Sequence, residues 1–266
     1  MTQGVKNTVA MFYAKREILG RTAIVELRRR YAGSVIGLAW VFLGPAILMA
    51  IYALIYGVVF KLKPQEFSSQ EYIVYILAGL VPFLGFSEGL TSGSGSLVAQ
   101  RDVLLSSIFP AELVPLRAVL VAFFAPVMGL VILLLADAMV GHFSFWSFLV
   151  PIFIGLLLLF LFGVVWILSL LNLVLRDIQQ VISYVTMVAL IASPIAYTPS
   201  MLPPGFSVLI WLNPLSYFVI AIQELVVFDR FPPLVVVIGC LVLGVGSFIS
   251  GLYVFLRAKT VFFDYA

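Results

Sequence analysis

Four ionisable side chains lie within or beside long apolar stretches of this chain: Glu88, Arg117, Asp137 and Glu224. A charge inside a membrane is costly, so such residues commonly mark ion pathways, proton relays or binding sites. Arg117 and Asp137, however, fall near opposite ends of one apolar stretch, and Glu224 belongs to an interrupted segment. Only Glu88 is expected to be embedded, so the pattern does not support a relay for protons or sodium ions.

The residue types that usually perform thiol, metal or phosphate chemistry are isolated. Cys240 is the one cysteine and His142 the one histidine, which excludes an internal disulfide and gives neither residue a partner for metal binding. The string TSGSGS at residues 91–96 is followed by Leu97 rather than by lysine and then serine or threonine, so it does not match a phosphate-binding loop. We interpret this string as a small-residue face for close helix packing.

The composition is that of an integral membrane protein. Of the 266 residues, 63% are hydrophobic and 10% are charged, and the mean hydropathy is +1.19. A helix needs about 20 apolar residues to cross about 30 Å of hydrocarbon. We therefore predict an all-α integral membrane protein, a single transmembrane domain over residues 1–266. Its six transmembrane helices are expected near residues 35–60, 71–97, 113–140, 147–174, 180–198 and 234–256.

Basic residues orient these spans, because cytoplasmic loops carry an excess of lysine and arginine. With six spans, the basic residues expected on the outer side of the membrane are only Lys61, Lys63 and Arg230. The inner set is Lys6, Lys15, Arg16, Arg21, Arg28, Arg29, Arg30, Arg101, Arg117, Arg176, Arg257 and Lys259. This bias predicts that both termini are cytoplasmic.

An amphipathic pattern precedes the first span. Over residues 12–30, apolar side chains recur at helical spacing and basic ones lie towards the other side. The pattern predicts a helix in the membrane interface, although a solvated helix packed on a partner protein would give the same pattern. The residues that hold the start of the first span at an anionic inner surface are Arg28, Arg29, Arg30 and Tyr31.

The segment over residues 199–233 is apolar but interrupted by prolines. We expect residues 199–228 to form two short helices that re-enter the membrane from the outer side, between spans five and six. The backbone groups freed by the breaks would then be buried in protein or line a wet cavity. The alternative is a seventh span near residues 206–228, which would place Arg257 and Lys259 outside.

The cytoplasmic connection after the second span has the pattern of a docking helix. Its apolar centre can fill a groove on a soluble partner while flanking charges set the register. A plain surface loop is the alternative. The residues expected to make this contact are Arg101, Asp102, Leu105, Ile108 and Phe109.

Aromatic residues make up 14% of the chain, and many fall in the first two spans. Most are expected to pack within the protein or lie in the interface. Rings with apolar faces and polar edges can also line a passage along which sugars slide without tight binding. The candidates for such a lining are Trp40, Tyr52, Tyr56, Tyr75, Phe83 and Phe86.

Several short motifs, by their order and spacing, resemble those of one known family. They are Arg30, Tyr31, Ser34, Gly37, Trp40 and Pro45; Arg176 and Asp177; Ser193, Pro194, Ile195 and Tyr197; and Leu212, Asn213 and Pro214. Over nearly the whole chain the sequence resembles the membrane subunit of type 2 ABC exporters, and within them the branch that exports polysaccharides.

The resemblance implies a permease rather than an enzyme. Such a subunit forms a homodimer in the phospholipid membrane and recruits two copies of a separate ATP-binding ABC subunit. ATP and Mg would be bound by that partner, no cofactor is expected in this chain, and no nucleic acid is expected as a partner. The implied cargo is a lipid-linked polysaccharide, such as O-antigen lipopolysaccharide or capsule, exported across a bacterial inner membrane.

The resemblance also implies roles for three segments. Residues 12–30 would be the interfacial helix beside the ATPase, residues 98–112 a coupling helix, and residues 199–228 outer gate helices. The gate residues implied by position are Tyr197, Trp211, Asn213 and Pro214.

Three alternatives stay open at this point. A type 2 exporter of a drug or small lipid would share the spans and the docking loop. A membrane enzyme acting on lipid-linked sugars would need an acidic metal-binding cluster, whereas Asp102, Glu112 and Asp177 are scattered. An ion-coupled transporter is disfavoured by the short chain, the lack of visible repeats and the single embedded carboxylate.

Overall fold

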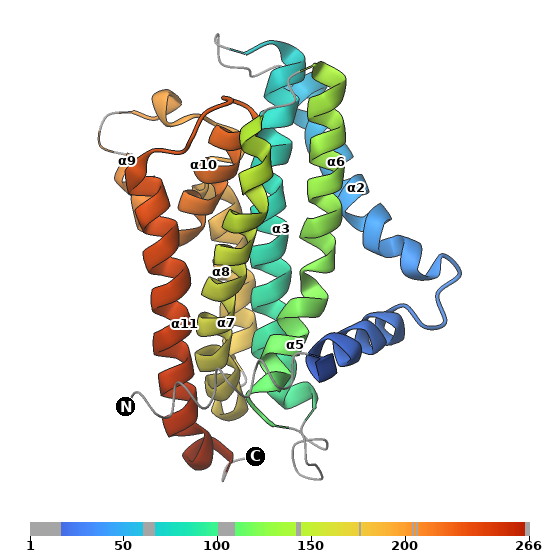
Figure 1. The fold of residues 1–266 in the computed structure, drawn as a ribbon, viewed down its shortest axis with the longest axis vertical. Helices are drawn as coiled ribbons and strands as arrows, with labels where there is room; N and C mark the ends of the chain where they lie inside the picture. The colour runs from blue at the N-terminus through green and yellow to red at the C-terminus, as the bar shows by residue number, and fades with distance from the viewer. Residues whose placement is uncertain are drawn as a thin grey trace.

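The computed structural model describes residues 17–60, 67–100, 110–141, 145–175, 177–203, 205 and 207–263. Within these residues the chain is helical and has no strand. The long helices run side by side along one axis (Figure 1). This arrangement confirms the all-α prediction and suits a lipid environment, where a helix satisfies its own backbone hydrogen bonds.

Five helical segments are long and apolar enough to cross a membrane. They are Gly37–Gly57, Ser69–Ala99, Leu113–Val140, Phe145–Val174 and Leu234–Ala258. The segment expected as a fifth span forms a shorter helix, α8 (Ile178–Ala192), of 15 residues. At about 1.5 Å per residue it covers roughly 22 Å, less than the hydrocarbon thickness. It stops before the predicted boundary because Ser193 is extended ahead of Pro194, as residues before proline prefer.

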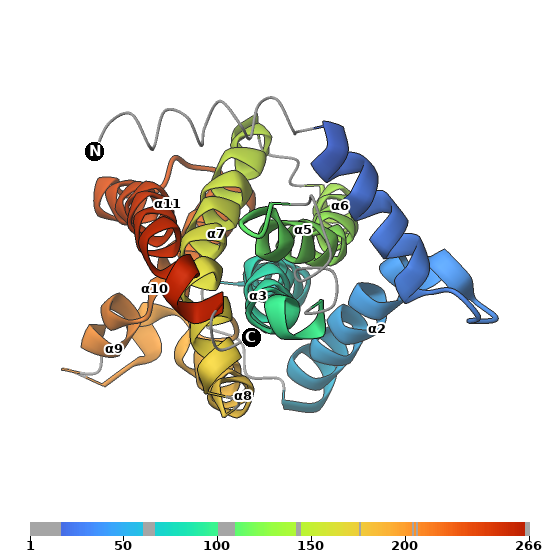
Figure 2. The ribbon, with the colours of Figure 1, turned by 90° about the horizontal axis from the view of Figure 1, so that it is seen from below.

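Helix α3 (Ser69–Ala99) forms the centre of the bundle. A capping box starts it: Ser68 Oγ accepts from the Glu71 N–H at 3.2 Å, and Glu71 Oε2 accepts from the Ser68 N–H at 2.7 Å. Helices α5 (Leu113–Ala122), α6 (Phe124–Val140), α7 (Val150–Val174) and α10 (Pro214–Val226) pack around it (Figure 2). Most of α3 is therefore buried inside the protein.

The glycine- and serine-rich end of α3 packs closely on its neighbours. A Cβ added at Gly93 would lie 2.5 Å from Val165 Cγ1 and 2.8 Å from Val119 Cγ2, so only glycine fits there. Ser94 adds polar contacts, because its carbonyl accepts from Asn172 Nδ2 at 3.2 Å and its hydroxyl accepts from Gln179 Nε2 at 3.0 Å. Close helix packing at Gly93, Ser94 and Ser96 confirms the small-residue interpretation for the second half of this string.

Helices α7 and α11 (Leu234–Phe263) cross with their backbones in near contact. A Cβ at Gly163 would collide with the Ser247 carbonyl, and one at Gly251 would collide with the Gly163 carbonyl. One at Gly244 would lie 2.8 Å from the Leu156 carbonyl oxygen. Small residues permit this approach, on which helix association in lipid depends.

Helix α2 (Trp40–Leu54) lies at the edge of the bundle (Figure 2). A 3₁₀ turn, η1 (Gly37–Ala39), precedes it and a π-helical turn, η2 (Ile55–Phe60), follows it. Its main neighbour is α6, and most of its surface is left uncovered by the rest of the chain. The third span bends at Phe123, between α5 and α6, three residues before the helix-breaking Pro126.

The proline-rich segment contains a 3₁₀ turn, η4 (Pro199–Met201), followed by α9 (Ser207–Leu212) and α10. Neither α9 nor α10 is long enough to cross a membrane. Asn213 separates them and caps α10, since its Oδ1 accepts from the Leu215 N–H at 3.1 Å. Pro214 occupies the first turn, where its missing N–H costs nothing.

A short helix over residues 17–30 and an η3 turn (Phe145–Leu149) complete the described elements. The helix over residues 17–30 lies at the same end of the bundle as the C-terminal end of α11, whereas α9 lies near the other end (Figure 1). The described chain therefore begins and ends on one side.

Candidate functional site

The family-like motif at the start of the first span gathers around one pocket of about 200 Å³. Residues from that motif that line it are Arg30, Tyr31, Trp40 and Pro45. The turn that brings them together is held by Ser34, whose Oγ accepts from the Gly37 N–H at 3.3 Å, and by Gly37, whose φ of 59° favours glycine. The motif is thus a local site as well as a sequence signature.

Glu88 also lines this pocket and forms an ion pair with Arg30. Its side chain is 35% exposed, and the pairing with Arg30 means that this carboxylate is not isolated. Burial lowers the pKa of Arg30, but Coulomb attraction and the hydrogen bond to Glu88 outweigh it and raise the pKa overall. The pair ties the helix over residues 17–30 to α3.

A double-mutant cycle tests this link. We expect Arg30→Gln and Glu88→Gln to share a coupling free energy of about 0.5 kcal/mol, because half-exposed ion pairs contribute little. Thermal unfolding of the two single variants and the double variant measures it. If the two single substitutions changed the free energy of unfolding in a strictly additive way, the ion pair between Arg30 and Glu88 would be contradicted.

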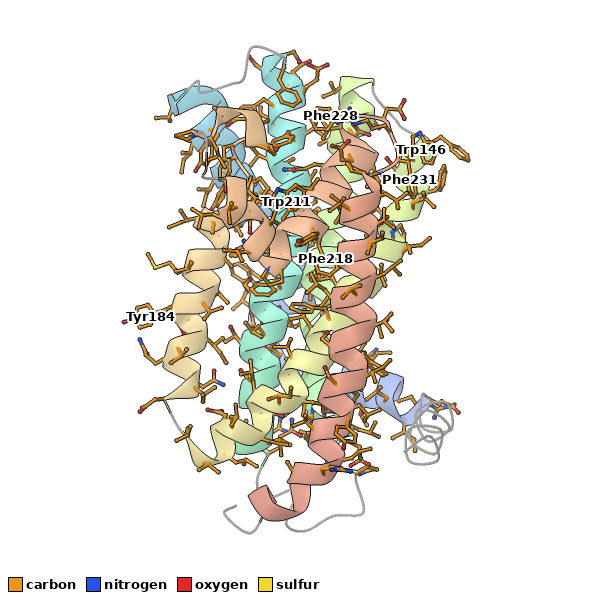
Figure 3. The ribbon with its side chains drawn as sticks, turned by 90° about the vertical axis from the view of Figure 1, so that its left-hand side faces the viewer. Trp146, Tyr184, Trp211, Phe218, Phe228 and Phe231 are labelled. Atoms are coloured by element: carbon orange, nitrogen blue, oxygen red, sulfur yellow. The ribbon has the colours of Figure 1, made fainter. Side chains whose placement is uncertain are left out.

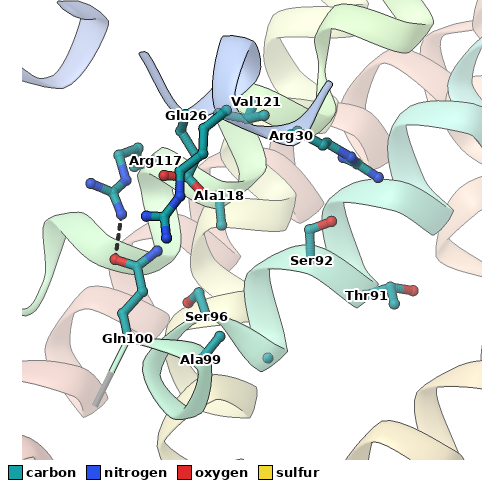
Figure 4. A pocket seen from close by; sticks show the side chains of 12 residues that line it. Glu26, Arg30, Thr91, Ser92, Ser96, Ala99, Gln100, Arg117, Ala118 and Val121 are labelled. Carbon is teal, nitrogen blue, oxygen red and sulfur yellow. Dashed lines mark hydrogen bonds between the residues drawn. The ribbon is translucent and has the colours of Figure 1, made fainter. Parts of the chain in front are cut away.

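A larger basic pocket of about 780 Å³ adjoins the first one. Arg29, Arg30 and Arg117 line it with hydroxyl groups from α3. Arg117 donates a hydrogen bond to Gln100 Oε1, which joins the middle of α5 to the end of α3 (Figure 4). Both pockets share Arg30 and Val121 as lining residues.

A second cluster holds the irregular backbone after α8, at residues 194–197, against α3. Tyr72 donates to the Ala196 carbonyl at 2.6 Å, and Tyr75 donates to the carbonyls of Pro194 and Tyr197 at 3.3 and 3.1 Å. Gln223 of α10 donates to the Pro194 carbonyl at 2.9 Å. These donors satisfy carbonyls that no helix satisfies, so the irregular backbone is buried in protein.

Gln223→Leu should destabilise this cluster. Gln223 is 2% exposed, and its loss removes a donor from a buried carbonyl, which costs on the order of 2 kcal/mol. Thermal unfolding in detergent measures the loss. Gln180→Leu, the same change on the exposed surface of α8, is the control and should be nearly neutral. Equal melting temperatures for the two variants would contradict the stabilising role of the hydrogen bond from Gln223 to the Pro194 carbonyl.

The structure places the six predicted channel-lining aromatics in different surroundings. Tyr75 is 2% exposed and belongs to the cluster above, and Phe86 is buried against Phe160 with ring centroids 6.5 Å apart. Tyr52 and Tyr56 are half-buried and stack at 5.9 Å. Phe83 is half-buried and Trp40 is 37% exposed. The long-range contact of Tyr75 has no local signal in the sequence.

The predicted outer-gate residues lie around the break before α10. Tyr197 donates to the Ala192 carbonyl at 2.7 Å, and Asn213 Nδ2 donates to Ser193 Oγ at 2.8 Å. Trp211 is 43% exposed and tilts against Tyr217 at 5.6 Å. Two of the family-like motifs, at residues 193–197 and 212–214, therefore contact each other through one hydrogen bond.

The predicted coupling residues, Arg101, Asp102, Leu105, Ile108 and Phe109, lie outside the described residues. Residues 12–16 of the predicted interfacial helix, and Arg176, also lie outside them. The described part of that helix, residues 17–30, buries Ala23 and Leu27 against the bundle and exposes Ile18, Ile24 and Val25.

Helix α8 presents an apolar face that the rest of the described chain leaves uncovered. Its exposed residues are Val181, Tyr184, Val185, Met187, Val188 and Ile191. Figure 3 shows Tyr184 pointing away from the bundle, whereas Phe218 of α10 lies inside it. An apolar groove of about 470 Å³ runs between α8 and α9, with Phe86, Asn213 and Pro214 in its lining.

The remaining ionisable candidates are Asp137 and Glu224. Asp137 is buried in α6, and Glu224 forms an ion pair with Arg230 just beyond α10. The hydrogen bond to Glu224 raises the pKa of Arg230, although burial opposes it.

The long apolar helices and the buried irregular backbone define a multi-pass helical membrane protein. A family model described as ABC-2 type transporter matches residues 23–227, and the chain belongs to that family.

Curated relatives cover most of the chain. It is 27% identical over 227 residues to the O-antigen export system permease protein RfbA of Myxococcus xanthus, covering 84% of this chain and 85% of that protein. It is 29% identical over 203 residues to a protein of the same name from Klebsiella pneumoniae, covering 75% and 76% of the two chains. A second such protein from Klebsiella pneumoniae is also 29% identical over 203 residues.

Proposed function

We propose that this chain is the membrane-spanning subunit of an ATP-driven exporter. The exporter moves a lipid-linked polysaccharide, either O-antigen lipopolysaccharide or capsule, out of the cytoplasm. The observation that carries this proposal is the similarity to permeases of O-antigen export over most of their length. Membership of the ABC-2 type transporter family implies an ATP-binding partner subunit. The chain itself acts as a permease and not as an enzyme, with ATP and Mg held by the partner.

The proposed topology has six spans in a bacterial inner membrane, with both termini cytoplasmic. Helix α8 and the extended residues after it form the fifth span, and α9 and α10 re-enter from the outer side. The helix over residues 17–30 and the C-terminal end of α11 lie at the same end of the bundle, which supports this orientation (Figure 1). The excess of basic residues in the inner set supports it further.

The working assembly is a homodimer with two ATP-binding subunits. The exposed apolar surfaces of α2 and α8 support a dimer seam at the first and fifth spans. Residues 98–112 form the coupling helix on the ATP-binding subunit. ATP-driven closure pushes on this helix and shifts the seam.

Movement at the seam opens a passage wide enough for a polymer. Four of the candidate aromatics are not fully buried and can offer their ring faces to sugars without binding them tightly. They are Trp40, Tyr52, Tyr56 and Phe83. The helices at 199–228, with Tyr197, Trp211, Asn213 and Pro214, form the outer gate. A long polymer needs a continuous lining and not one fitted pocket.

The test is deletion of the gene, beside a complemented control, followed by cell fractionation and probing for glycolipid. Cytoplasmic accumulation of polymer with a bare surface is the expected result, and it identifies the polymer. Unchanged surface polysaccharide would overturn the proposal and favour an exporter of a drug or small lipid.

A further inference from the structure

Helix α8 lies at the edge of the bundle and is held there by few contacts (Figure 2). Along its 15 residues only Ile182 and Ala189 are buried, and its main neighbours are α3 and α7. Among the described residues, one side-chain hydrogen bond joins α8 to another helix. Gln179 Nε2, in the first turn of α8, donates to Ser94 Oγ of α3 at 3.0 Å. The placement of this end of α8 therefore depends on that bond.

Ser94 accepts this bond in a fixed orientation. Its hydroxyl donates to the Thr91 carbonyl at 3.2 Å, which leaves its oxygen free to accept from Gln179. Asn172 Nδ2 of α7 donates to the Ser94 carbonyl at 3.2 Å. Ser94 is fully buried and Asn172 is 3% exposed, so water competes little for these bonds. Helices α3, α7 and α8 are thus linked through one serine.

A glycine beside Ser94 gives the Gln179 amide the room to approach. A Cβ added at Gly95 would lie 3.1 Å from Gln179 Nε2, and its three nearest atoms would all belong to the Gln179 side chain. A larger side chain at residue 95 would therefore press on the amide that bonds to Ser94. The two adjacent small residues have separate roles, because Ser94 accepts the bond and Gly95 makes space for it.

The bond between Gln179 and Ser94 lies close to the segment that the proposed function assigns to coupling. Residues 98–112 begin four residues after Ser94, which is about 6 Å along a helix. Gln179 is the second residue of α8, the helix that the proposed function places at the dimer seam. A displacement of the end of α3 would therefore reach α8 at its first turn, and the rest of α8 would carry it over roughly 22 Å.

We infer that Ser94 and Gln179 are positioning residues that make α8 follow the end of α3 when the coupling segment moves. Apolar contacts through Ile182 and Ala189 keep α8 on the bundle, but such contacts are not directional and do not prevent sliding. The hydrogen bond supplies the direction that they lack. The inference rests on the proposed function, because it requires an ATP-binding partner and a seam that moves.

The first test measures the bond itself in the full-length chain without its partner. Thermal unfolding in detergent compares Ser94→Ala, Gln179→Leu and the double variant. We expect the double variant to melt little below Gln179→Leu, because either single change already removes the bond. Gln180→Leu makes the same change at the exposed neighbouring residue and should melt like the wild-type chain. Strictly additive losses for Ser94→Ala and Gln179→Leu would overturn the inference, whatever the chain transports.

The second test follows α8 in the complex with the ATP-binding subunit. A nitroxide label is attached at Met187→Cys, a 60% exposed position on α8, in a Cys240→Ala background that removes the natural cysteine. Electron paramagnetic resonance then measures the distance between the labels of the two copies, with and without a non-hydrolysable ATP analogue. We expect Gln180→Leu to keep the ATP-dependent shift of the wild-type chain and Gln179→Leu to lose most of it. The distance without nucleotide should be the same in both variants, so the loss is not a change of fold.

The outcomes distinguish failure of this inference from failure of the proposed function. If the wild-type chain showed no ATP-dependent shift, the proposed function would fail and the inference would fail with it. If the wild-type chain showed the shift and Gln179→Leu kept it in full, only the inference would fail. Ser94→Ala removes a single oxygen atom and gives the same comparison if Gln179→Leu does not fold. Loss of the shift in Ser94→Ala or Gln179→Leu, but not in Gln180→Leu, is the supporting result.

Discussion

Gly163→Leu is expected to prevent α7 and α11 from packing. A Cβ at this position collides with the Ser247 backbone, so the added side chain cannot be accommodated by a rotamer change and the helices must separate. Overpacking a tight core costs about 1–3 kcal/mol, and a clash with backbone lies at or above the upper end of that range. We expect little folded protein after extraction in detergent, and a much lower melting temperature for what remains.

Gly155→Leu is the matched control, because Gly155 lies on the same helix and a Cβ there meets nothing within 4 Å. Size-exclusion chromatography and thermal unfolding of the two variants give the comparison. If both behaved alike, the near contact between the backbones of α7 and α11 would be wrong. Gly163→Ala should also destabilise the crossing, because its Cβ alone collides with the Ser247 carbonyl.

Phe109→Asp is expected to abolish export while leaving the membrane domain folded. The proposal assigns Phe109 to the apolar centre of the coupling helix, where a carboxylate would leave an unpaired charge in the contact with the ATP-binding subunit. We expect export to fall by about tenfold or more, and ATP hydrolysis to lose its dependence on the membrane subunit. Assays of both activities in proteoliposomes measure the effect.

Phe145→Asp makes the same chemical change at a 79% exposed position beyond the third span. It should leave ATP hydrolysis and export close to those of the wild-type protein. Normal export by a well-expressed Phe109→Asp variant would count against the docking role of residues 98–112.

The positions of five long apolar helices followed closely from the sequence. Length and hydropathy are local properties, so five of the six expected spans appear within a few residues of their expected bounds. The fifth segment was placed too long because hydropathy continues past Ala192, whereas Ser193 and Pro194 stop the helix. The proline rule was available from the sequence and would have corrected this boundary.

The contacts that build the sites could not be predicted in this way. Arg30 and Glu88 are 58 residues apart, and Tyr75 and Pro194 are 119 residues apart. No local pattern signals such pairing, so Glu88 was expected to be embedded alone and Tyr75 was expected to line a passage. Motif spacing did identify Asn213 and Ser193, but not the hydrogen bond between them.

The close crossing of α7 and α11 has a consequence for the biogenesis of this protein. During synthesis α7 is complete at Val174, whereas its partner begins only at Leu234. N-terminal segments are made and assembled first, so the face of α7 around Gly163 enters the bilayer with lipid in the place of α11. A chain that stalls before α11 would display that face to the quality-control proteases of the membrane, which makes arrival of the last helix a checkpoint for assembly.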